Sequence, residues 1–344
     1  MRMLRSASVV AFLTLAACSG GDGGGGSSST GGSGGGGSGG GGSGGVAGGS
    51  GAAGGASGGG GASGGGGTSG GGGTSGAGGA GGASGGAGGA GGASGGAGGT
   101  GGAVTGCGKS GAFVGLNDKA TITVGGVTRS YVLSVPADYV SSKKWPVIFG
   151  FHGLNADGAG ARNYLSLEQG AAKDAIFVYP TATNKSTGWK MKEGEGDVEL
   201  FDALVASLAA SHCIDPARVY STGFSHGAMF TNNLTCWRAS KLRAVAPTGG
   251  SGPWYGASCT ASLPAMITHG KSDGTVPLAD GVKTRDYWLK QNGCKSTTKP
   301  HAADPSCVAY DGCTKPVVWC EFAGGHTVPA FAGPGVKAFL LGAP

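Results

Sequence analysis

Short apolar runs alternate with longer amphipathic stretches along the carboxyl-terminal two thirds of the chain. Apolar runs predict strands buried on both faces, and such runs lie at 145–151, 265–269 and 317–320. A short β-like run lies at 217–221. Longer patterns that predict helices lie at 198–210, 228–237 and 282–289. Strands and helices that alternate in this way predict an α/β fold, with a mostly parallel sheet covered by helices.

One strand-to-helix junction carries a candidate nucleophile. The strand at 217–221 is joined to the next helix through Gly223-Phe224-Ser225-His226-Gly227. In a nucleophile elbow the serine occupies a strained bend, and a Cβ two residues before or after it would collide with neighbouring backbone. Glycines stand at both positions, so Ser225 is the predicted nucleophile. A G-x-S-x-G pattern alone is weak in a Gly-rich chain, and its partners must therefore be found.

An acid and a histidine follow the serine, in the chain order of α/β-hydrolases. Asp273 lies in a polar loop directly after one predicted strand, at the carboxyl end where the nucleophile also lies. His326 follows the last predicted strand, and two preceding glycines permit a tight turn that brings the imidazole over Ser225. We predict Ser225, Asp273 and His326 as a catalytic triad.

Other interpretations of these side chains stay open from the sequence. Asp273 precedes a glycine and fits an ordinary turn aspartate. His326 fits a loop histidine that is hydrogen-bonded to backbone. His269 is the rival base, but it lies within the end of a strand, and a base must reach the serine.

Two backbone amides are candidates for an oxyanion hole. The residue after the nucleophile contributes its N–H in an elbow, which indicates His226. The strand at 145–151 runs into His152-Gly153-Leu154, where the glycine permits a bend that points the next amide into the site. We predict the Leu154 N–H, with that of Gly153 as second choice. A simple strand-ending turn is the alternative.

Residues 107–344 as a whole resemble the esterases of carbohydrate esterase family 1, in particular feruloyl esterases, with polyhydroxybutyrate depolymerases as a related branch. The motifs that carry the resemblance are Arg-Ser-Tyr-Val-Leu-Ser-Val-Pro at 129–136, Phe-Gly-Phe-His-Gly-Leu at 149–154, Ile-Phe-Val-Tyr-Pro at 176–180, Thr-Gly-Trp at 187–189, the elbow, His-Gly-Lys-Ser-Asp at 269–273 and Gly-Gly-His at 324–326. The resemblance implies an α/β-hydrolase fold and the triad named above. Acyl specificity differs within that family.

The amino terminus has the pattern of a bacterial lipoprotein signal at 1–18. A basic start precedes an apolar core too short to span a bilayer, and Leu-Ala-Ala-Cys follows at 15–18. Cys18 is therefore the predicted lipidation site. An ordinary secretory peptide with a chance cysteine is the alternative. We expect placement at the outer membrane or cell surface of a bacterium, or release as a secreted enzyme, and the side that the anchor faces stays open.

Residues 19–106 consist almost wholly of Gly, Ser, Ala and Thr, and most of the chain's 82 glycines lie there. A segment with almost nothing apolar to bury, and without the Gly-X-Y period of collagen, is predicted to be disordered. A flexible chain of this length spans roughly 50 Å, so we interpret it as a tether. Residues 107–344 form the single catalytic domain.

The cysteine count and the net charge limit the classes of protein that this chain can belong to. Setting Cys18 aside leaves eight cysteines in the domain: Cys107, Cys213, Cys236, Cys259, Cys294, Cys307, Cys313 and Cys320. An even number in an exported domain predicts disulfides, and one or two bridges among the last four are expected to fix the approach to His326. A zinc site is the competing interpretation, but the cysteines lack the paired C-x-x-C spacing that is typical of zinc ligands. The formal net charge is +6, without basic runs typical of nucleic-acid binding.

The predicted function is hydrolysis of carboxylic esters through an acyl-enzyme. Feruloyl esters of plant cell-wall polysaccharide are the first expectation, and polyhydroxyalkanoate, synthetic polyester or acetylated xylan are alternative substrates. A non-catalytic surface adhesin is the alternative from another class. Trp189, in a polar Gly-containing loop, is the predicted aromatic contact for the acyl group. No metal or organic cofactor is expected, and we expect a monomer.

Overall fold

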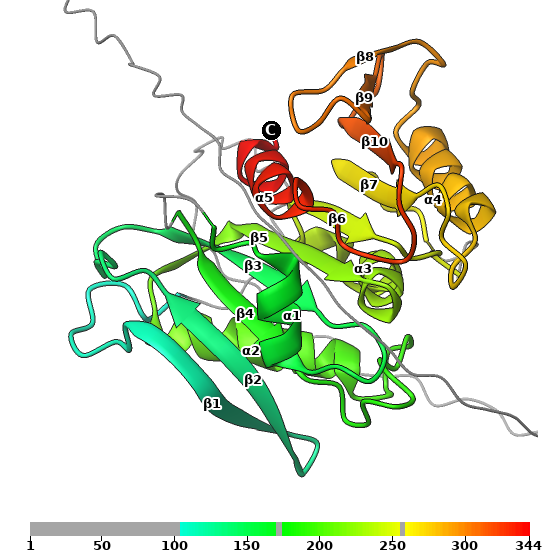
Figure 1. Ribbon diagram of the computed structural model, residues 1–344. Helices are drawn as coiled ribbons and strands as arrows, with labels where there is room; N and C mark the ends of the chain where they lie inside the picture. The colour runs from blue at the N-terminus through cyan, green and yellow to red at the C-terminus, as the bar shows by residue number, and fades with distance from the viewer. Residues whose placement is uncertain (1–103, 170–173, 255–258) are drawn as a thin grey trace, which may run out of the picture. The chain divides into compact units, whose positions relative to one another are not determined.

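The computed structural model describes residues 104–169, 174–254 and 259–344. The predicted signal segment with Cys18, and the linker up to residue 103, lie outside the described residues. Within the described ranges one continuous sheet is flanked by helices on both faces (Figure 1). No helix of that part of the chain combines the length and the apolar character needed to cross a bilayer.

The sheet has ten strands in the order β1-β2-β4-β3-β5-β6-β7-β10-β9-β8. Their bounds are β1 Gly115–Val124, β2 Val127–Val135, β3 Trp145–Phe151, β4 Ile176–Pro180, β5 Ile214–Phe224, β6 Ala244–Thr248, β7 Ala265–Gly270, β8 Thr298–Pro300, β9 Cys307–Tyr310 and β10 Val317–Phe322. The six central strands, β4, β3, β5, β6, β7 and β10, pair in parallel. The outer strands β1 and β2 on one side, and β9 and β8 on the other, pair antiparallel. Parallel strands place all their carboxyl ends at one edge, so that edge collects the loops after them.

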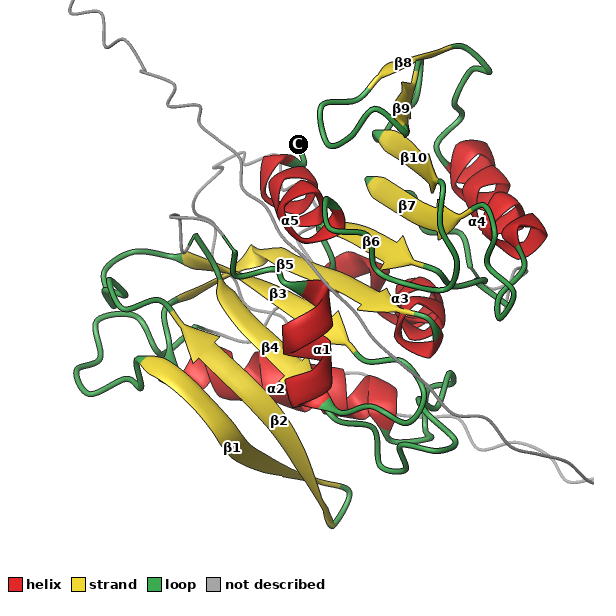
Figure 2. Ribbon diagram, viewed as in Figure 1, coloured by secondary structure: helices red, strands yellow, loops and turns green. Residues whose placement is uncertain are grey.

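Five α-helices cover the two faces of this sheet (Figure 2). They are α1 Gly158–Leu165, α2 Asp197–Ser211, α3 His226–Arg238, α4 Leu278–Gln291 and α5 Ala332–Gly342, with a short 3₁₀ helix at Ala239–Lys241. Side chains from α2, α3 and α4 share one buried cluster with the sheet, whereas those of α1 and α5 share the other. Both faces of the central strands are therefore covered, as their continuous hydrophobic runs predict.

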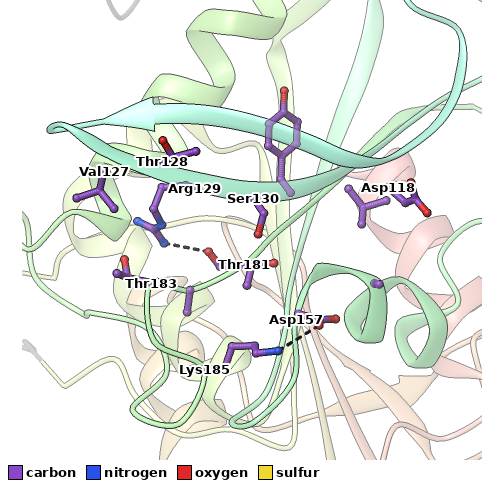
Figure 3. Close-up of a pocket in the computed structure, with 13 residues that line it drawn as sticks. Asp118, Val127, Thr128, Arg129, Ser130, Asp157, Thr181, Thr183 and Lys185 are labelled. Atoms are coloured by element: carbon purple, nitrogen blue, oxygen red, sulfur yellow. Dashed lines mark hydrogen bonds and ion pairs between the residues drawn. The ribbon is translucent and has the colours of Figure 1, made fainter.

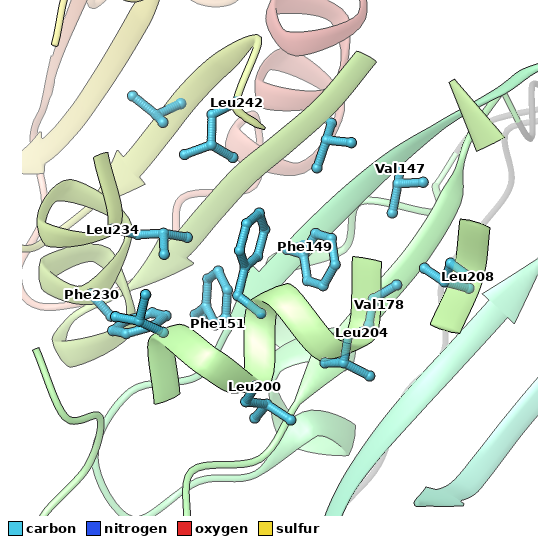
Figure 4. Close-up of a cluster of buried hydrophobic side chains, with 14 of the residues drawn as sticks. Val147, Phe149, Phe151, Val178, Leu200, Leu204, Leu208, Phe230, Leu234 and Leu242 are labelled. Carbon is cyan, nitrogen blue, oxygen red and sulfur yellow. The ribbon is translucent and has the colours of Figure 1, made fainter. Parts of the chain in front are cut away.

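Aromatic side chains within the larger cluster, which is mostly aliphatic, connect β3 to two helices (Figure 4). Phe149 and Phe151 project from β3 and meet Phe201 of α2 and Phe230 of α3, with ring centroids 4.8 Å apart in both pairs. Burying each such ring contributes about 1.5–3 kcal/mol. This packing fixes α2 and α3 against β3 and β5, the strands that lead into the predicted oxyanion loop and the elbow.

The α/β-hydrolase fold predicted from the sequence is confirmed, and most predicted elements are present. The helices extend beyond the predicted ranges, because polar residues that carry no hydrophobic pattern continue them at both ends. Helices α1 and α5 and strands β1, β2, β4, β6, β8 and β9 were not predicted. Glycine and proline within α5, and only eight residues in α1, hide both helices from a pattern search.

All eight cysteines of the domain form disulfides: Cys107–Cys213, Cys236–Cys259, Cys294–Cys313 and Cys307–Cys320. Oxidised pairs leave no thiolate for the competing zinc interpretation. Two bridges lie among the last four cysteines, as predicted. One of them joins β9 to β10, the strand that leads into the loop of His326.

Candidate active site

Ser225 stands between the end of β5 and the first residue of α3. Its backbone has φ 56° and ψ −121°, a positive φ that non-glycine residues rarely adopt. The Ser225 N–H donates to Thr248 of β6, and its carbonyl accepts from Met229 in the first turn of α3. The strained bend is thus fixed from both sides, which is the geometry predicted for an elbow.

The two glycines of the pentapeptide are sterically required. A Cβ on Gly223 would lie 2.5 Å from the Gly227 carbonyl and 2.9 Å from the Phe151 carbonyl oxygen. A Cβ on Gly227 would collide with the Phe151 carbonyl group. The elbow therefore packs backbone against backbone, between α3 and the end of β3.

His326 contacts both of its predicted partners. Its Nε2 lies 2.9 Å from the Ser225 Oγ, and its Nδ1 lies 2.7 Å from Asp273 Oδ2. The centroid of the imidazole lies 4.7 Å from that of the Phe224 ring, with the two planes tilted by 36°, and the His326 side chain is 18% exposed. The structure therefore brings Ser225, His326 and Asp273 into one hydrogen-bonded chain. A proton on Nδ1 that donates to Asp273 leaves Nε2 free to accept the serine proton.

Asp273 is held as an anion by its surroundings. Its Oδ1 accepts the backbone N–H groups of Thr275 and Val276, at 2.9 and 2.8 Å, and its Oδ2 accepts from His326. Burial acts to raise the pKa of Asp273, but the hydrogen bonds from His326 and the two amides outweigh it, so the pKa lies below its ordinary value. A charged carboxylate at this position orients the imidazole.

Backbone hydrogen bonds join the two loops that carry the acid and the base. The Ser272 N–H donates to the Gly324 carbonyl and the Lys271 N–H to that of Phe322. A Cβ on Gly270 would collide with the Gly324 and Gly325 carbonyl groups, so the loops approach closely at that point. The spacing between Asp273 and His326 follows from these main-chain contacts.

His269, the rival base, is placed elsewhere. It lies in β7 with no exposed surface, and its Nε2 is 2.9 Å from the Val276 carbonyl oxygen and 3.6 Å from Asp273 Oδ2. Its Nδ1 has no hydrogen-bond partner among the described residues and faces Gly281 of α4. The ring packs behind the acid and does not reach Ser225.

The two predicted oxyanion amides have open N–H groups. The Gly153 N–H donates to the Tyr164 hydroxyl at 2.8 Å, and this removes Gly153, the second choice, from the candidates. In the described ranges no acceptor is hydrogen-bonded to the N–H of Leu154 or of His226. A Cβ on Gly153 would lie 3.3 Å from the Ser225 Cβ, so the loop passes directly beside the nucleophile.

Two further histidines shape this region through defined tautomers. The Ala182 N–H donates to His152 Nε2, so the His152 proton is on Nδ1, which faces the Gly153 carbonyl oxygen at 2.6 Å. The Trp189 N–H donates to His226 Nδ1. Burial lowers the pKa of both histidines, and both rings are therefore neutral at pH 7. His152 positions the Gly153 peptide, a role that its place before a glycine did not reveal.

Trp189 differs from its predicted role. Its side chain is 2% exposed, its ring packs against Phe151 and Phe230, and its indole N–H donates to the His152 carbonyl oxygen. No face of this ring is open to an acyl group. The prediction of Trp189 as an aromatic acyl contact is wrong, because burial of a side chain in a polar loop has no signature in the sequence. Trp189 instead supports the loop of His152.

Two other aromatic side chains, Trp254 and Tyr164, are candidates for acyl contacts and differ in their exposure to solvent. Trp254 is half exposed, but its backbone N–H bonds to Asn233, eight residues and roughly 12 Å along α3 from Ser225. The ring of Tyr164 stands edge-on to Phe224 beside the site. Burial raises the pKa of Tyr164 to about 12, so its hydroxyl stays protonated. Leu154, 46% exposed, is the large apolar side chain open to solvent next to the nucleophile loop.

Comparison with known proteins gives named relatives, although no family model matches the chain. Probable feruloyl esterase C of Aspergillus terreus is 35% identical over 211 residues, which cover 58% of this chain and 76% of that protein. Feruloyl esterase D of Neurospora crassa is 32% identical over 233 residues, which cover 62% and 79%. Feruloyl esterase C of Emericella nidulans is 35% identical over 211 residues, which cover 58% and 76%.

A solved structure gives an independent comparison of the fold. The acetyl xylan esterase from Aspergillus awamori aligns with a TM-score of 0.54 at 16% identity, over 65% of this chain and 98% of that one. At this identity the similarity shows the fold alone.

Proposed function

The chain belongs to the family of the feruloyl esterases C and D and is a carboxylic ester hydrolase, and from this premise we propose that it releases hydroxycinnamoyl groups, feruloyl above all, from plant cell-wall polysaccharides. The observation that carries the proposal beyond the family name is the hydrogen-bonded chain from Ser225 through His326 to Asp273. A serine, a histidine and a carboxylate connected in this order are the groups that carry out acyl transfer in triad hydrolases.

The proposed reaction begins at Ser225. His326 Nε2 takes the proton from the hydroxyl as the oxygen attacks the ester carbonyl carbon, and Asp273 stabilises the imidazolium that forms. The amides of Leu154 and His226 donate to the developing oxyanion. His326 then returns its proton to the departing sugar hydroxyl. Water repeats the sequence on the acyl-enzyme, releases the acid and restores Ser225.

Acetylated xylan is the second candidate substrate. Neither Trp189 nor Trp254 lies open beside Ser225, so the described aromatic side chains offer no evident platform for a large acyl ring. An acetyl group needs no such platform. A non-catalytic adhesin is disfavoured, because a surface protein has no use for a strained serine with a charged acid–base pair.

The proposed location is the outside of a bacterial cell. Four disulfides support an oxidising compartment. We propose that Cys18 carries the lipid, that residues 19–106 act as a tether, and that residues 107–344 act as a monomer on esterified polysaccharide. A Cys18→Ser variant should leave the membrane fraction, and a mature amino terminus at any residue other than Cys18 would contradict the anchor.

Substrate choice is tested by one panel on the full-length protein. Initial rates on methyl ferulate, acetylated xylan and short hydroxybutyrate oligomers are compared, with Ser225→Ala as the blank for each. The proposal predicts the largest kcat/KM on methyl ferulate. A larger value on acetylated xylan would transfer the assignment to the second candidate.

A further inference from the structure

A polar cavity of about 400 Å³ lies between the β1–β2 hairpin and the loop that follows β4 (Figure 3). Its walls include Ser130 of β2, Asp157 before α1, and Thr181, Thr183 and Lys185 after β4. No residue of the proposed triad or oxyanion hole lines it. Its volume is within the range of about 300–1,000 Å³ typical of small-molecule sites.

The lining combines polar and apolar side chains, and four of its residues are charged. It holds two carboxylates, Asp118 and Asp157, and two cations, Arg129 and Lys185. Lys185 Nζ lies 3.4 Å from Asp157 Oδ2, with both side chains about half exposed. Arg129 is buried and pairs with Asp197, outside the cavity. With Arg129 neutralised by Asp197, the lining keeps Asp118, Asp157 and Lys185 and so one net negative charge, which disfavours anions such as nucleotides or acidic polysaccharide.

Hydroxyl groups supply much of the remaining surface. Thr128, Ser130 and Thr183 are exposed at the cavity, and each hydroxyl both donates and accepts hydrogen bonds. The Lys185 ammonium adds donors and the Asp157 carboxylate adds an acceptor. A ring that carries several neutral hydroxyls has the same dual capacity at each position, so its chemistry matches this lining. The apolar part of the lining, which includes Val127 and Ala159, can contact the C–H faces of such a ring.

The cavity wall is already fixed in place. Arg129 donates to the Thr181 carbonyl oxygen, and the Gly158 N–H donates to the Thr181 hydroxyl. The Ala182 N–H is bonded to the buried His152 ring. A wall ordered before the ligand arrives lowers the entropic cost of binding.

The cavity shares the carboxyl edge of the sheet with Ser225. Strands β4 and β5 are separated by β3 alone, so two steps of about 4.8 Å place the wall after β4 roughly 10 Å from the nucleophile along that edge. The loop after β4 continues from Lys185, whose carbonyl accepts from Asn155, to Gly188, which lies against the Leu154 and His226 side chains. A single loop thus borders the cavity at one end and the nucleophile at the other.

We propose that this cavity is a subsite for a neutral oligosaccharide, and that it binds the sugar chain of an ester whose carbonyl is at Ser225. The inference rests on the proposed function for the identity of the sugar, a xylan-type backbone. The cavity would let the enzyme select esters on a polysaccharide over the same acyl group on a small alcohol. Binding energy from this remote part of the substrate then raises kcat/KM on the polymer.

Binding without hydrolysis gives the first test. Full-length protein carrying Ser225→Ala is titrated with xylohexaose, which has no ester, by isothermal calorimetry. Addition of Thr183→Trp, which fills the cavity, should weaken binding at least about tenfold, the effect of one or two lost hydrogen bonds. Thr298→Trp, at an exposed threonine on β8 at the opposite end of the sheet and outside the lining, is the matched control and should bind as well as the parent. An oligogalacturonate of equal length should bind more weakly than xylohexaose.

Lys185→Ala provides a second variant in case Thr183→Trp disturbs the loop, and thermal melting confirms that each variant is folded. In the active enzyme both variants should lower the ratio of kcat/KM on feruloylated arabinoxylan oligosaccharide to that on methyl ferulate, by about tenfold for Thr183→Trp. Absence of xylohexaose binding, or equal binding in all four proteins, would overturn the subsite. Sugar binding that depends on the cavity in a protein that hydrolyses neither ferulate ester would instead retain the subsite and refute the proposed function.

Discussion

The two halves of the candidate active site are held by different physical means. The elbow at 223–227 is fixed by backbone packing, in which glycines let α3 approach the end of β3 within contact distance. The acid and base stand on loops after β7 and β10, and these are fixed by main-chain hydrogen bonds and by a disulfide behind them. The elbow depends on the absence of side chains, whereas the loops depend on cross-links between distant segments.

This difference determines what each half tolerates. A close-packed backbone junction cannot expand by one methyl group without moving a helix or a strand. Loops joined by several separate bonds lose them one at a time. We therefore expect substitutions in the elbow to affect folding, and substitutions in the acid–base loops to affect chemistry first.

The largest expected effect is on chemistry. His326→Ala should lower kcat on methyl ferulate by several orders of magnitude, because no other side chain of the described residues is hydrogen-bonded to the Ser225 hydroxyl. His269→Gln is the matched control, and it should retain most of the activity because its ring packs behind Asp273. Steady-state rates on folded, melting-checked proteins make the comparison. Equal losses in both variants would make His269 part of the catalytic unit.

A substitution in the elbow should show the opposite behaviour. Gly227→Val places two methyl groups and a Cβ against the Phe151 carbonyl, and it should destabilise the domain by about 3 kcal/mol or more, as overpacking combined with backbone displacement does. Urea unfolding followed by circular dichroism measures this loss. Gly274→Val is the control, since a Cβ there meets open space. A Gly227→Val protein as stable as wild type would contradict the packing account.

Disulfide removal separates stability from activity. Joint replacement of Cys307 and Cys320 by serine opens a bridge with a sequence separation of 13, which should cost about 3 kcal/mol and also lower kcat, because β10 leads to His326. Joint replacement of Cys107 and Cys213, with a separation of 106, should cost more stability and leave kcat unchanged. Melting curves and rates at 25 °C would show this reversal. If both double variants lost stability and kcat to the same extent, the bridge behind His326 would have no special effect on catalysis.

The smallest expected effect is a pH dependence of stability that arises from Asp273. Its pKa is lowered in the folded state, so its contribution is fully present above the ordinary aspartate pKa of about 4 and disappears as pH falls through the lower folded value. Asp273→Asn should therefore flatten the decline in unfolding free energy below about pH 4. Denaturant titrations at a series of pH values measure the slope. An unchanged slope would show that Asp273 has an ordinary pKa.

The sequence was informative where function is local. The spacing of Gly223, Ser225 and Gly227 predicts the bend because each requirement acts over two residues. The order of Asp273 and His326 after the serine predicts their meeting, since carboxyl ends of parallel strands share an edge. Both predictions needed the fold class alone.

Features that depend on side-chain burial or on strand pairing could not be predicted from the sequence. Trp189 has polar neighbours along the chain, yet three-dimensional packing encloses it. Eight cysteines allow 105 pairings, and the three-dimensional fold selects those observed. The polar cavity forms because β2 lies beside β4, a pairing that no local pattern specifies. Gly153 is excluded as an oxyanion donor because its N–H is bonded to the Tyr164 hydroxyl, eleven residues away in the sequence.

The most direct test of Ser225 as the nucleophile is kcat/KM on methyl ferulate for wild type and Ser225→Ala, both full length and matched in melting temperature. We expect hydrolysis by the wild type and a kcat/KM lower by several orders of magnitude in the variant, with unchanged stability. Near-native turnover by Ser225→Ala would contradict the assignment of Ser225 as the nucleophile.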